Sequence, residues 1–143
     1  MRKRTQAREC ALIVLYQAEI TRRSLESASK VFWTDRQTID KRIIDYCERL
    51  TSGIEKHVDA IDKKISEYAT NWQLKRMAVI DRNVLRIGVY ELLFTSDIPP
   101  KVTINEAVEL AKKFGDLDSS KFVNGILDKI HKTELSAEDK QDS

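Results

Sequence analysis

The stretch from Asp81 to Phe94 constrains the fold more than any other part of this 143-residue chain. If it forms a helix, its apolar side chains are not confined to one face. Those apolar residues surround the helix: Val84, Leu85, Ile87, Gly88, Tyr90, Leu92, Leu93 and Phe94. A helix that is apolar all round must be buried. The sequence therefore predicts a central helix against which other helices pack.

Two charged residues in this stretch need a structural role. Arg86 lies between apolar neighbours on the predicted helix, and a buried charge without a partner is costly. We therefore expect Arg86 to meet an opposite charge or hydrogen-bond acceptors inside the protein. Asp81 precedes the apolar run and is well placed to cap the helix N-terminus.

Helical patterns also cover most of the remaining chain. Only four glycines and two prolines interrupt it, and β-branched residues nowhere alternate for long. The expected helical segments are 5–20, 25–32, 38–54 with a continuation to 68, a short turn at 74–79, the central helix from 81, 104–114, and a last helix through 122–130. The fold class is therefore all-α, with about seven helices including short ones.

Local signals predict several boundaries. Ser24 is placed as an N-cap, and Gly53 marks a kink in the long pattern. The sequence from Thr103 to Glu106 is a capping box, so the following helix should begin at Ile104 and end at Gly115.

Helical periodicity lapses at Thr70, Asn71 and Trp72 without any flexible-linker composition. This lapse predicts an N-terminal helical domain over residues 1–70 and a C-terminal one over 71–133. Residues 134–143 contain one leucine among polar residues, so we expect a disordered tail.

Composition restricts the class of protein. The formal charge is +2 and 41% of residues are hydrophobic, which suits one compact domain or two small ones. Cys10 and Cys47 lie inside apolar patterns and are expected to be buried free thiols. No apolar run approaches the roughly 20 residues that span a bilayer, and no signal peptide is recognisable. We expect a cytoplasmic protein with no membrane contact.

Motifs for catalysis are missing from the sequence. It contains no Gly-rich phosphate loop, no paired-cysteine metal motif and no nucleophile elbow, and His57 and His131 are far apart. We therefore expect no catalytic residues, no metal and no cofactor. A binding protein is favoured over an enzyme.

Basic residues at the N-terminus provide the first candidate binding site. Arg2, Lys3 and Arg4 are followed one turn later by Arg8. Cationic side chains at a helix N-terminus suit contacts to phosphates. The alternative, a basic N-terminus that is exposed to water and binds no ligand, fits this short cluster equally well.

The second candidate is an apolar strip on the first helix, formed by Leu12, Tyr16 and Ile20. If the strip is exposed, it could contact another protein, and Tyr16 is the residue best suited to an interface. Burial of the strip inside a helical bundle is the alternative.

The third candidate is the helix start around Asp118 and Phe122. Backbone N–H groups at a helix start can bind phosphate, and an aromatic ring there can stack on a base. By spacing alone, however, Phe122 shares one face with Ile126 and Ile130 and would belong to the core.

Several segments together resemble the NusB family of bacterial transcription antitermination factors. They are Asp81–Arg86 with Tyr90–Leu92, Asp97–Pro99, Val102–Lys112, Lys121–Asp128, and the first-helix residues Arg4, Ala7, Arg8, Ala11, Leu15 and Tyr16. The resemblance covers nearly the whole chain and is weakest from Thr21 to Ser52.

This resemblance implies two packed three-helix bundles. It also implies binding to the boxA segment of ribosomal RNA transcripts as a heterodimer with NusE, a small-subunit ribosomal protein. NusA, NusG and RNA polymerase would join in a larger complex that suppresses premature termination. The alternative is a helical protein-interaction module without specific RNA binding, which could form a homodimer when free.

The resemblance also assigns roles to residues. It implies RNA contacts by Arg2, Lys3, Arg4, Arg8, Asp118 and Phe122. It places Tyr16 and Asp81 toward NusE, with Leu12, Ile20 and Arg82 as their neighbours in that interface. Family members often have glutamate at the position of Asp81.

Overall fold

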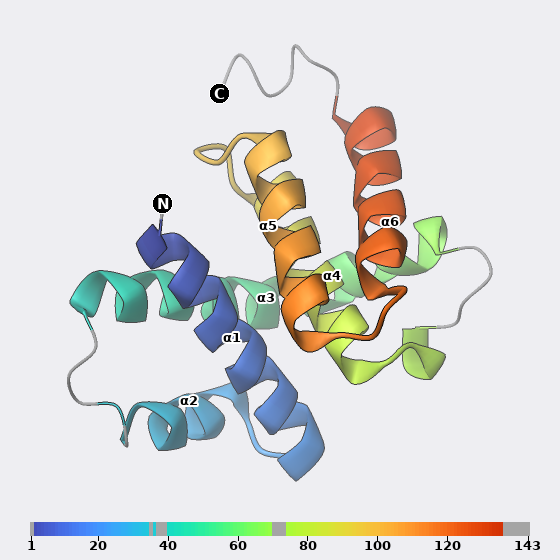
Figure 1. The fold of residues 1–143 in the computed structure, drawn as a ribbon. Coiled ribbons are helices and arrows are strands. Elements are labelled where there is room, and N and C mark those ends of the chain that lie inside the picture. Colours follow the sequence, from blue (N-terminus) through green and yellow to red (C-terminus); the bar gives the residue numbers. More distant parts are fainter. Residues whose placement is uncertain (1, 35, 37–39, 70–73, 136–143) are drawn as a thin grey trace. The chain divides into compact units, whose positions relative to one another are not determined.

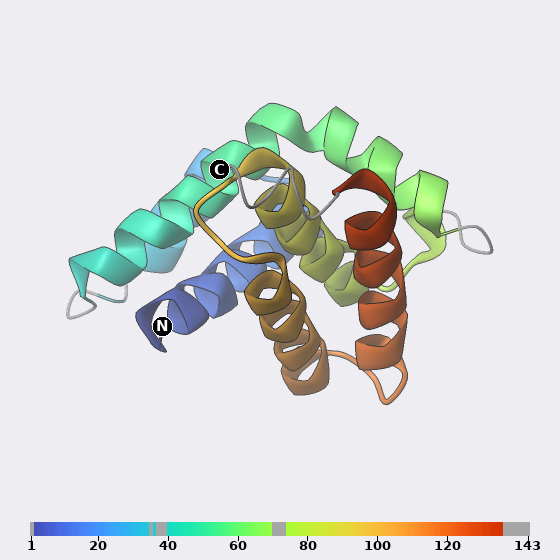
Figure 2. The ribbon, with the colours of Figure 1, turned by 90° about the horizontal axis from the view of Figure 1, so that it is seen from above.

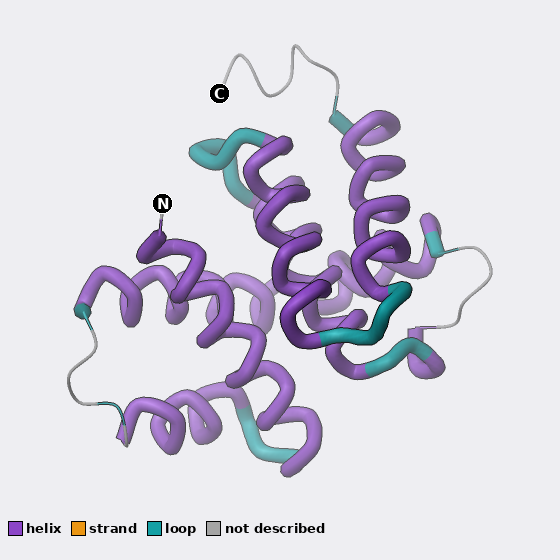
Figure 3. The backbone as a smooth tube through the Cα atoms, in the orientation of Figure 1, coloured by secondary structure: helices purple, strands orange, loops and turns teal. Residues whose placement is uncertain are grey.

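The computed structural model describes residues 2–34, 36, 40–69 and 74–135, and all regular structure in these ranges is helical (Figure 3). The elements are α1 (Arg2–Thr21), α2 (Leu25–Thr34), α3 (Lys41–Tyr68), the 3₁₀ turn η1 (Leu74–Arg76), α4 (Val79–Phe94), α5 (Pro100–Phe114) and α6 (Ser119–Glu134). The all-α class and the number of helices agree with the prediction. The predicted lapse at Thr70–Trp72 and most of the predicted tail fall outside the described residues.

The chain divides into two compact units, residues 1–56 (unit 1) and 57–143 (unit 2). The division falls within α3, at His57, whose φ of −114° and ψ of 19° depart from helical values. The sequence placed the boundary after residue 70 and the kink at Gly53. The kink prediction was wrong, because the helix continues through the glycine and breaks at His57.

Unit 1 contains α1, α2 and the first part of α3, and α1 packs against α2 (Figure 1). Their shared core consists of Val14, Ala18, Ala28 and Phe32, with Cys10, Ile13, Leu25 and Trp33 packed beside it. The Ser24 hydroxyl oxygen accepts the Ser27 N–H at 3.1 Å, which confirms the predicted N-cap. A short polar cap thus sets the start of α2.

Unit 2 is built around α4, as the apolar stretch predicted. Ten of its residues are buried, and α5 and α6 both pack on it. Figure 2 shows α5 and α6 side by side, running in opposite directions across a short turn. Gly88 permits close approach of α6, because a Cβ atom there would lie 2.7 Å from Leu127 Cδ1.

Arg86 has the internal partner that the sequence required. Its Nε and Nη2 atoms donate to the two carboxylate oxygens of Asp62 at 2.8 and 2.9 Å, and Nη1 donates to Asn83 Oδ1 at 3.0 Å. A bidentate pair of this kind fixes both charges in one geometry. The ion pair therefore ties α4 to the second part of α3.

Two predicted helix starts were wrong. The cap position of α4 is Ala78, so Asp81 lies in the first turn and caps nothing. The next helix, α5, begins at Pro100, because proline is favoured in the first turn of a helix. The hydroxyl of Thr103 is therefore inside the helix and donates to Glu91 Oε1 at 2.9 Å. The predicted helix end at Gly115 is confirmed.

Both cysteines are free. Cys47 is buried, and burial raises the pKa of its thiol to about 12. Cys10 is half-buried, and burial also raises its pKa. Among the described residues, no helix combines the length and the hydropathy that crossing a membrane requires.

Candidate nucleic-acid interface

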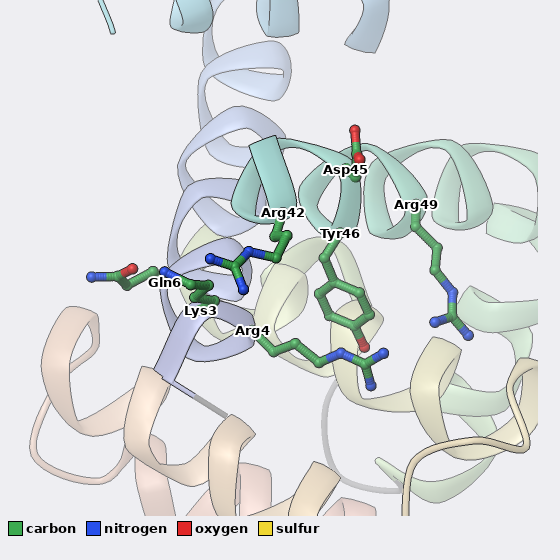
Figure 4. Close-up of a pocket in the computed structure, with 7 residues that line it drawn as sticks. All are labelled: Lys3, Arg4, Gln6, Arg42, Asp45, Tyr46 and Arg49. Atoms are coloured by element: carbon green, nitrogen blue, oxygen red, sulfur yellow. The ribbon is translucent and has the colours of Figure 1, made fainter. Parts of the chain in front are cut away.

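The starts of α1 and α3 together form a basic concave surface in unit 1. This basic pocket has a volume of about 840 Å³ and is lined by Lys3, Arg4, Gln6, Arg42, Asp45, Tyr46 and Arg49 (Figure 4). In the close-up, Arg4 and Arg49 reach toward the side of the pocket that holds the Tyr46 ring, and Asp45 points the other way. The lining therefore carries four cations and one carboxylate.

Asp40 connects the two helix starts. Its carboxylate lies 3.0 Å from the Lys3 ammonium and 3.0 Å from Arg42 Nη2, and it accepts the Arg42 backbone N–H at 2.8 Å. Hydrogen bonds from Arg42, and then from Lys3, hold the pKa of Asp40 well below its ordinary value. Asp40 thus caps α3 and holds two cations at one edge of the basic pocket.

Tyr46 lies among three guanidinium groups. The guanidinium carbon is 4.6 Å from the ring centre for Arg4, 5.5 Å for Arg49 and 5.6 Å for Arg8. These distances are within the range of cation–π attraction. The ring therefore attracts positive charge from both α1 and α3.

The predicted RNA residues at the N-terminus do not all reach the surface. Lys3 and Arg4 line the basic pocket. Arg8 is only 2% exposed, so its predicted direct contact with RNA is corrected: it lies one turn beyond Arg4, on a side of α1 that the folded chain covers. The side chain of Arg2 lies outside the described part of the structure.

Sequence reasoning missed the contribution of α3 to this surface. Arg42, Tyr46 and Arg49 follow one another at spacings of four and three residues, which places them on one helix face. That spacing was a usable signal. Nothing in the sequence, however, indicated that this face would lie beside the start of α1.

The apolar strip on α1 is exposed only in part. Tyr16 is 38% exposed and Ile20 is 56% exposed, but Leu12 is fully buried. The predicted role of Leu12 in a protein interface is therefore corrected. Leu12 follows Arg8 by one turn, on the covered side of the helix, whereas Tyr16 and Ile20 face solvent.

Three other predicted site residues come together in unit 2. Asp81, Asp118 and Phe122 line an acidic pocket of about 730 Å³, with Met77, Ala78, Asp116, Ser119 and Lys121. Asp81 Oδ1 is buried and has no hydrogen-bond partner. The pocket therefore contains three carboxylates and one ammonium, so it disfavours phosphate.

Arg82 is not available to a protein partner, contrary to its predicted place in the NusE interface. Its side chain is buried, and Nη1 donates to the carbonyl oxygens of Leu74 at 3.0 Å and Met77 at 3.3 Å. Burial, and then the nearby charge of Arg86, lower its pKa. Arg82 holds η1 against α4, which is a structural role.

The described residues contain no group of three or more His, Cys, Asp or Glu side chains that could hold a metal ion. Two separate concave surfaces remain as candidates: the basic pocket of unit 1 and the acidic pocket of unit 2.

Comparison with known proteins identifies the family. The NusB family profile matches residues 5–132. The transcription antitermination protein NusB of Anaeromyxobacter dehalogenans is 47% identical over 128 residues, which cover 90% of this chain and 89% of that protein. Proteins of this name are transcription factors and not enzymes.

Solved structures agree with this assignment. NusB of T. maritima is 42% identical with a TM-score of 0.85, and the match covers 96% of each chain. A chain in the crystal structure of the antitermination factors NusB and NusE in complex with dsRNA is 31% identical with a TM-score of 0.84, covering 92% of this chain and 98% of that one. The chain described here belongs to the NusB family of transcription antitermination proteins.

Proposed function

We propose that this protein promotes processive transcription by binding boxA-type RNA together with a NusE-type ribosomal protein. The observation that carries the proposal is the basic pocket, where Lys3, Arg4, Arg42 and Arg49 converge. Cations that line a concave surface attract the phosphate backbone of a single strand. The related structure of NusB and NusE in complex with dsRNA supports RNA and a NusE-type protein as the classes of partner.

The acidic pocket plays a different part in this proposal. Its carboxylates repel phosphates, so it would contact bases. The half-buried Phe122 ring could stack on a base, and Asp118 could accept hydrogen bonds from base amino groups. Phosphate contacts would then belong to unit 1, and base contacts to unit 2.

The protein partner is proposed to contact the exposed residues of the α1 strip and, separately, Asp81. Tyr16 and Ile20 expose apolar surface on α1, which suits an interface core. Asp81 is half-buried and lines the acidic pocket, where its carboxylate could accept a hydrogen bond from the partner. The NusE-bound protein would then join NusA, NusG and RNA polymerase in the cytoplasm.

A binding titration tests the proposal. A boxA-type RNA and a scrambled RNA of equal length are each titrated into the protein, with and without NusE. We expect tighter binding of the boxA-type RNA, and a further gain when NusE is present. Equal affinity for the two RNAs under both conditions would reject specific recognition. Homodimerisation that NusE does not reverse would favour the interaction-module alternative.

Arginine variants test the basic pocket itself. Arg4→Ala or Arg49→Ala should weaken RNA binding about fivefold and reduce the slope of log affinity against log salt by about 0.7, because one phosphate contact to a single strand is lost. Arg23→Ala, which removes an exposed arginine in the turn that follows α1, is the matched control. Identical salt slopes for all three variants and the parent would remove the pocket from the RNA interface.

A further inference from the structure

The ring of Tyr46 is the common neighbour of cations that come from two helices. Arg4 comes from the first turn of α1, and Arg49 follows Tyr46 by three residues on α3. Their guanidinium carbons lie 4.6 and 5.5 Å from the ring centre. One aromatic side chain therefore contacts both of the arginines that line this side of the basic pocket.

Tyr46 itself has little surface to offer a ligand. Only 6% of it is exposed, whereas Arg4 is exposed and Arg49 is half-buried. The ring of Tyr46 is therefore too covered for an RNA base to stack on it. Any effect of Tyr46 on a bound RNA must act through the arginines that it holds.

An aromatic ring holds a cation differently from a carboxylate. Asp40 holds Lys3 and Arg42 by ion pairs at 3.0 Å, and its negative charge offsets part of theirs. The attraction between a ring and a guanidinium group comes from the ring quadrupole, and it leaves the full positive charge in place. The ring contact thus restricts Arg4 and Arg49 without itself adding negative charge.

We propose that Tyr46 is a positioning residue for RNA binding, whose ring orders the guanidinium groups of Arg4 and Arg49 before the phosphate arrives. This inference rests on the proposed RNA-binding function. Arginine side chains lose considerable rotamer freedom when they are fixed, and this loss weakens binding. A ring that restricts them in the free protein moves that loss from the binding step to folding.

Ring substitution tests the proposal without changing the shape of the site. Tyr46→Phe keeps the ring and should bind a short single-stranded boxA-type RNA with nearly parental affinity. Incorporating 3,4,5-trifluorophenylalanine at position 46 keeps the shape but withdraws charge from the ring face. We expect it to weaken binding about tenfold relative to Tyr46→Phe, because the contacts of the ring with both pocket arginines, Arg4 and Arg49, are reduced.

The salt dependence separates positioning from loss of charge. The fluorinated variant keeps every cation, so its slope of log affinity against log salt should equal that of the parent. Arg4→Ala should lower the slope. Thermal unfolding of each variant checks that the fold is retained, and Tyr46→Leu provides a ringless comparison.

The possible outcomes are distinct. Equal RNA affinity for Tyr46→Phe and its trifluorinated counterpart would overturn the positioning role while leaving RNA binding intact. Failure of the parent protein to bind the RNA would reject the proposed function itself. A slope that falls with fluorination would also overturn the proposal, since it would mean that phosphate contacts were lost.

Discussion

Two arginines in each unit serve opposite purposes. In unit 2, Arg86 is fixed by the Asp62 carboxylate and Arg82 by backbone carbonyl oxygens, and little of either side chain meets solvent. In unit 1, Arg4 and Arg49 lie against the Tyr46 ring and line an open pocket. The same side chain thus stabilises the fold in one unit and presents positive charge in the other.

The difference lies in what each guanidinium group contacts. A carboxylate satisfies both the charge and the planar donor geometry of arginine, so the pair contributes to structure. An aromatic ring restricts the position of the guanidinium group but brings no negative charge to neutralise it. Substitutions of Arg82 or Arg86 should therefore change stability, whereas substitutions of Arg4 or Arg49 should change RNA binding.

The largest change in stability is expected when the carboxylate that pairs with Arg86 is removed. Asp62→Ala leaves a guanidinium group with only 16% of its side chain exposed and no bidentate partner, so we expect the free energy of unfolding to fall by about 3 kcal/mol. Urea denaturation measures it. Asp59→Ala, at an exposed position of the same helix, should change it by less than about 0.5 kcal/mol. Equal stability of the two variants would contradict a structural role for the pair.

Replacing arginine by lysine should have a smaller effect, which again differs between the two units. Arg86→Lys loses the bidentate geometry and should lower the free energy of unfolding by about 1 to 2 kcal/mol. Arg4→Lys should leave stability unchanged and RNA affinity within about threefold, because phosphate also accepts a point charge. Calorimetry and RNA titration of both variants test this. A destabilised Arg4→Lys would show that the ring contact is mainly structural.

The smallest effect concerns Asp40 and depends on pH. Its folded-state pKa lies below the unfolded value, so its contribution to stability is present above about pH 4 and is lost as pH falls through the folded pKa. The stability difference between Asp40→Asn and the parent should therefore be constant near pH 7 and shrink below about pH 4. Urea denaturation across pH measures it, with Asp45→Asn as the control for lost charge. A difference that grows on acidification would contradict the ion pairs.

The periodicity of the sequence correctly predicted features that depend on one helix alone. Apolar residues on all sides of the helix after Asp81 sufficed to identify it as buried and central. Its burial in turn required a partner for Arg86. The identity of that partner could not be read, because Asp62 is 24 residues away and belongs to another helix. The Thr103 capping box was misleading for a similar reason, since the hydroxyl is used by Glu91 across a helix contact.

For the site, too, the sequence predicted features of single helices but not which helices come together. The basic start of α1 could be recognised from composition, but the burial of Arg8 and Leu12 depends on how the chain folds over α1. The α3 side of the basic pocket had a regular spacing at Arg42, Tyr46 and Arg49, yet a spacing does not say which helix start it will meet. Asp81 and Phe122 share a pocket only because the α5–α6 turn returns to the start of α4.

The protected thiols have a practical consequence for labelling chemistry. Alkylating reagents attack the thiolate, and burial raises the pKa of both Cys10 and Cys47, so the native cysteines stay protonated at neutral pH. A cysteine introduced at an exposed position such as Gln17 would react with a maleimide much faster than either. A fluorescent probe could therefore be attached beside the α1 strip, with both native cysteines kept in place, to follow the arrival of a partner.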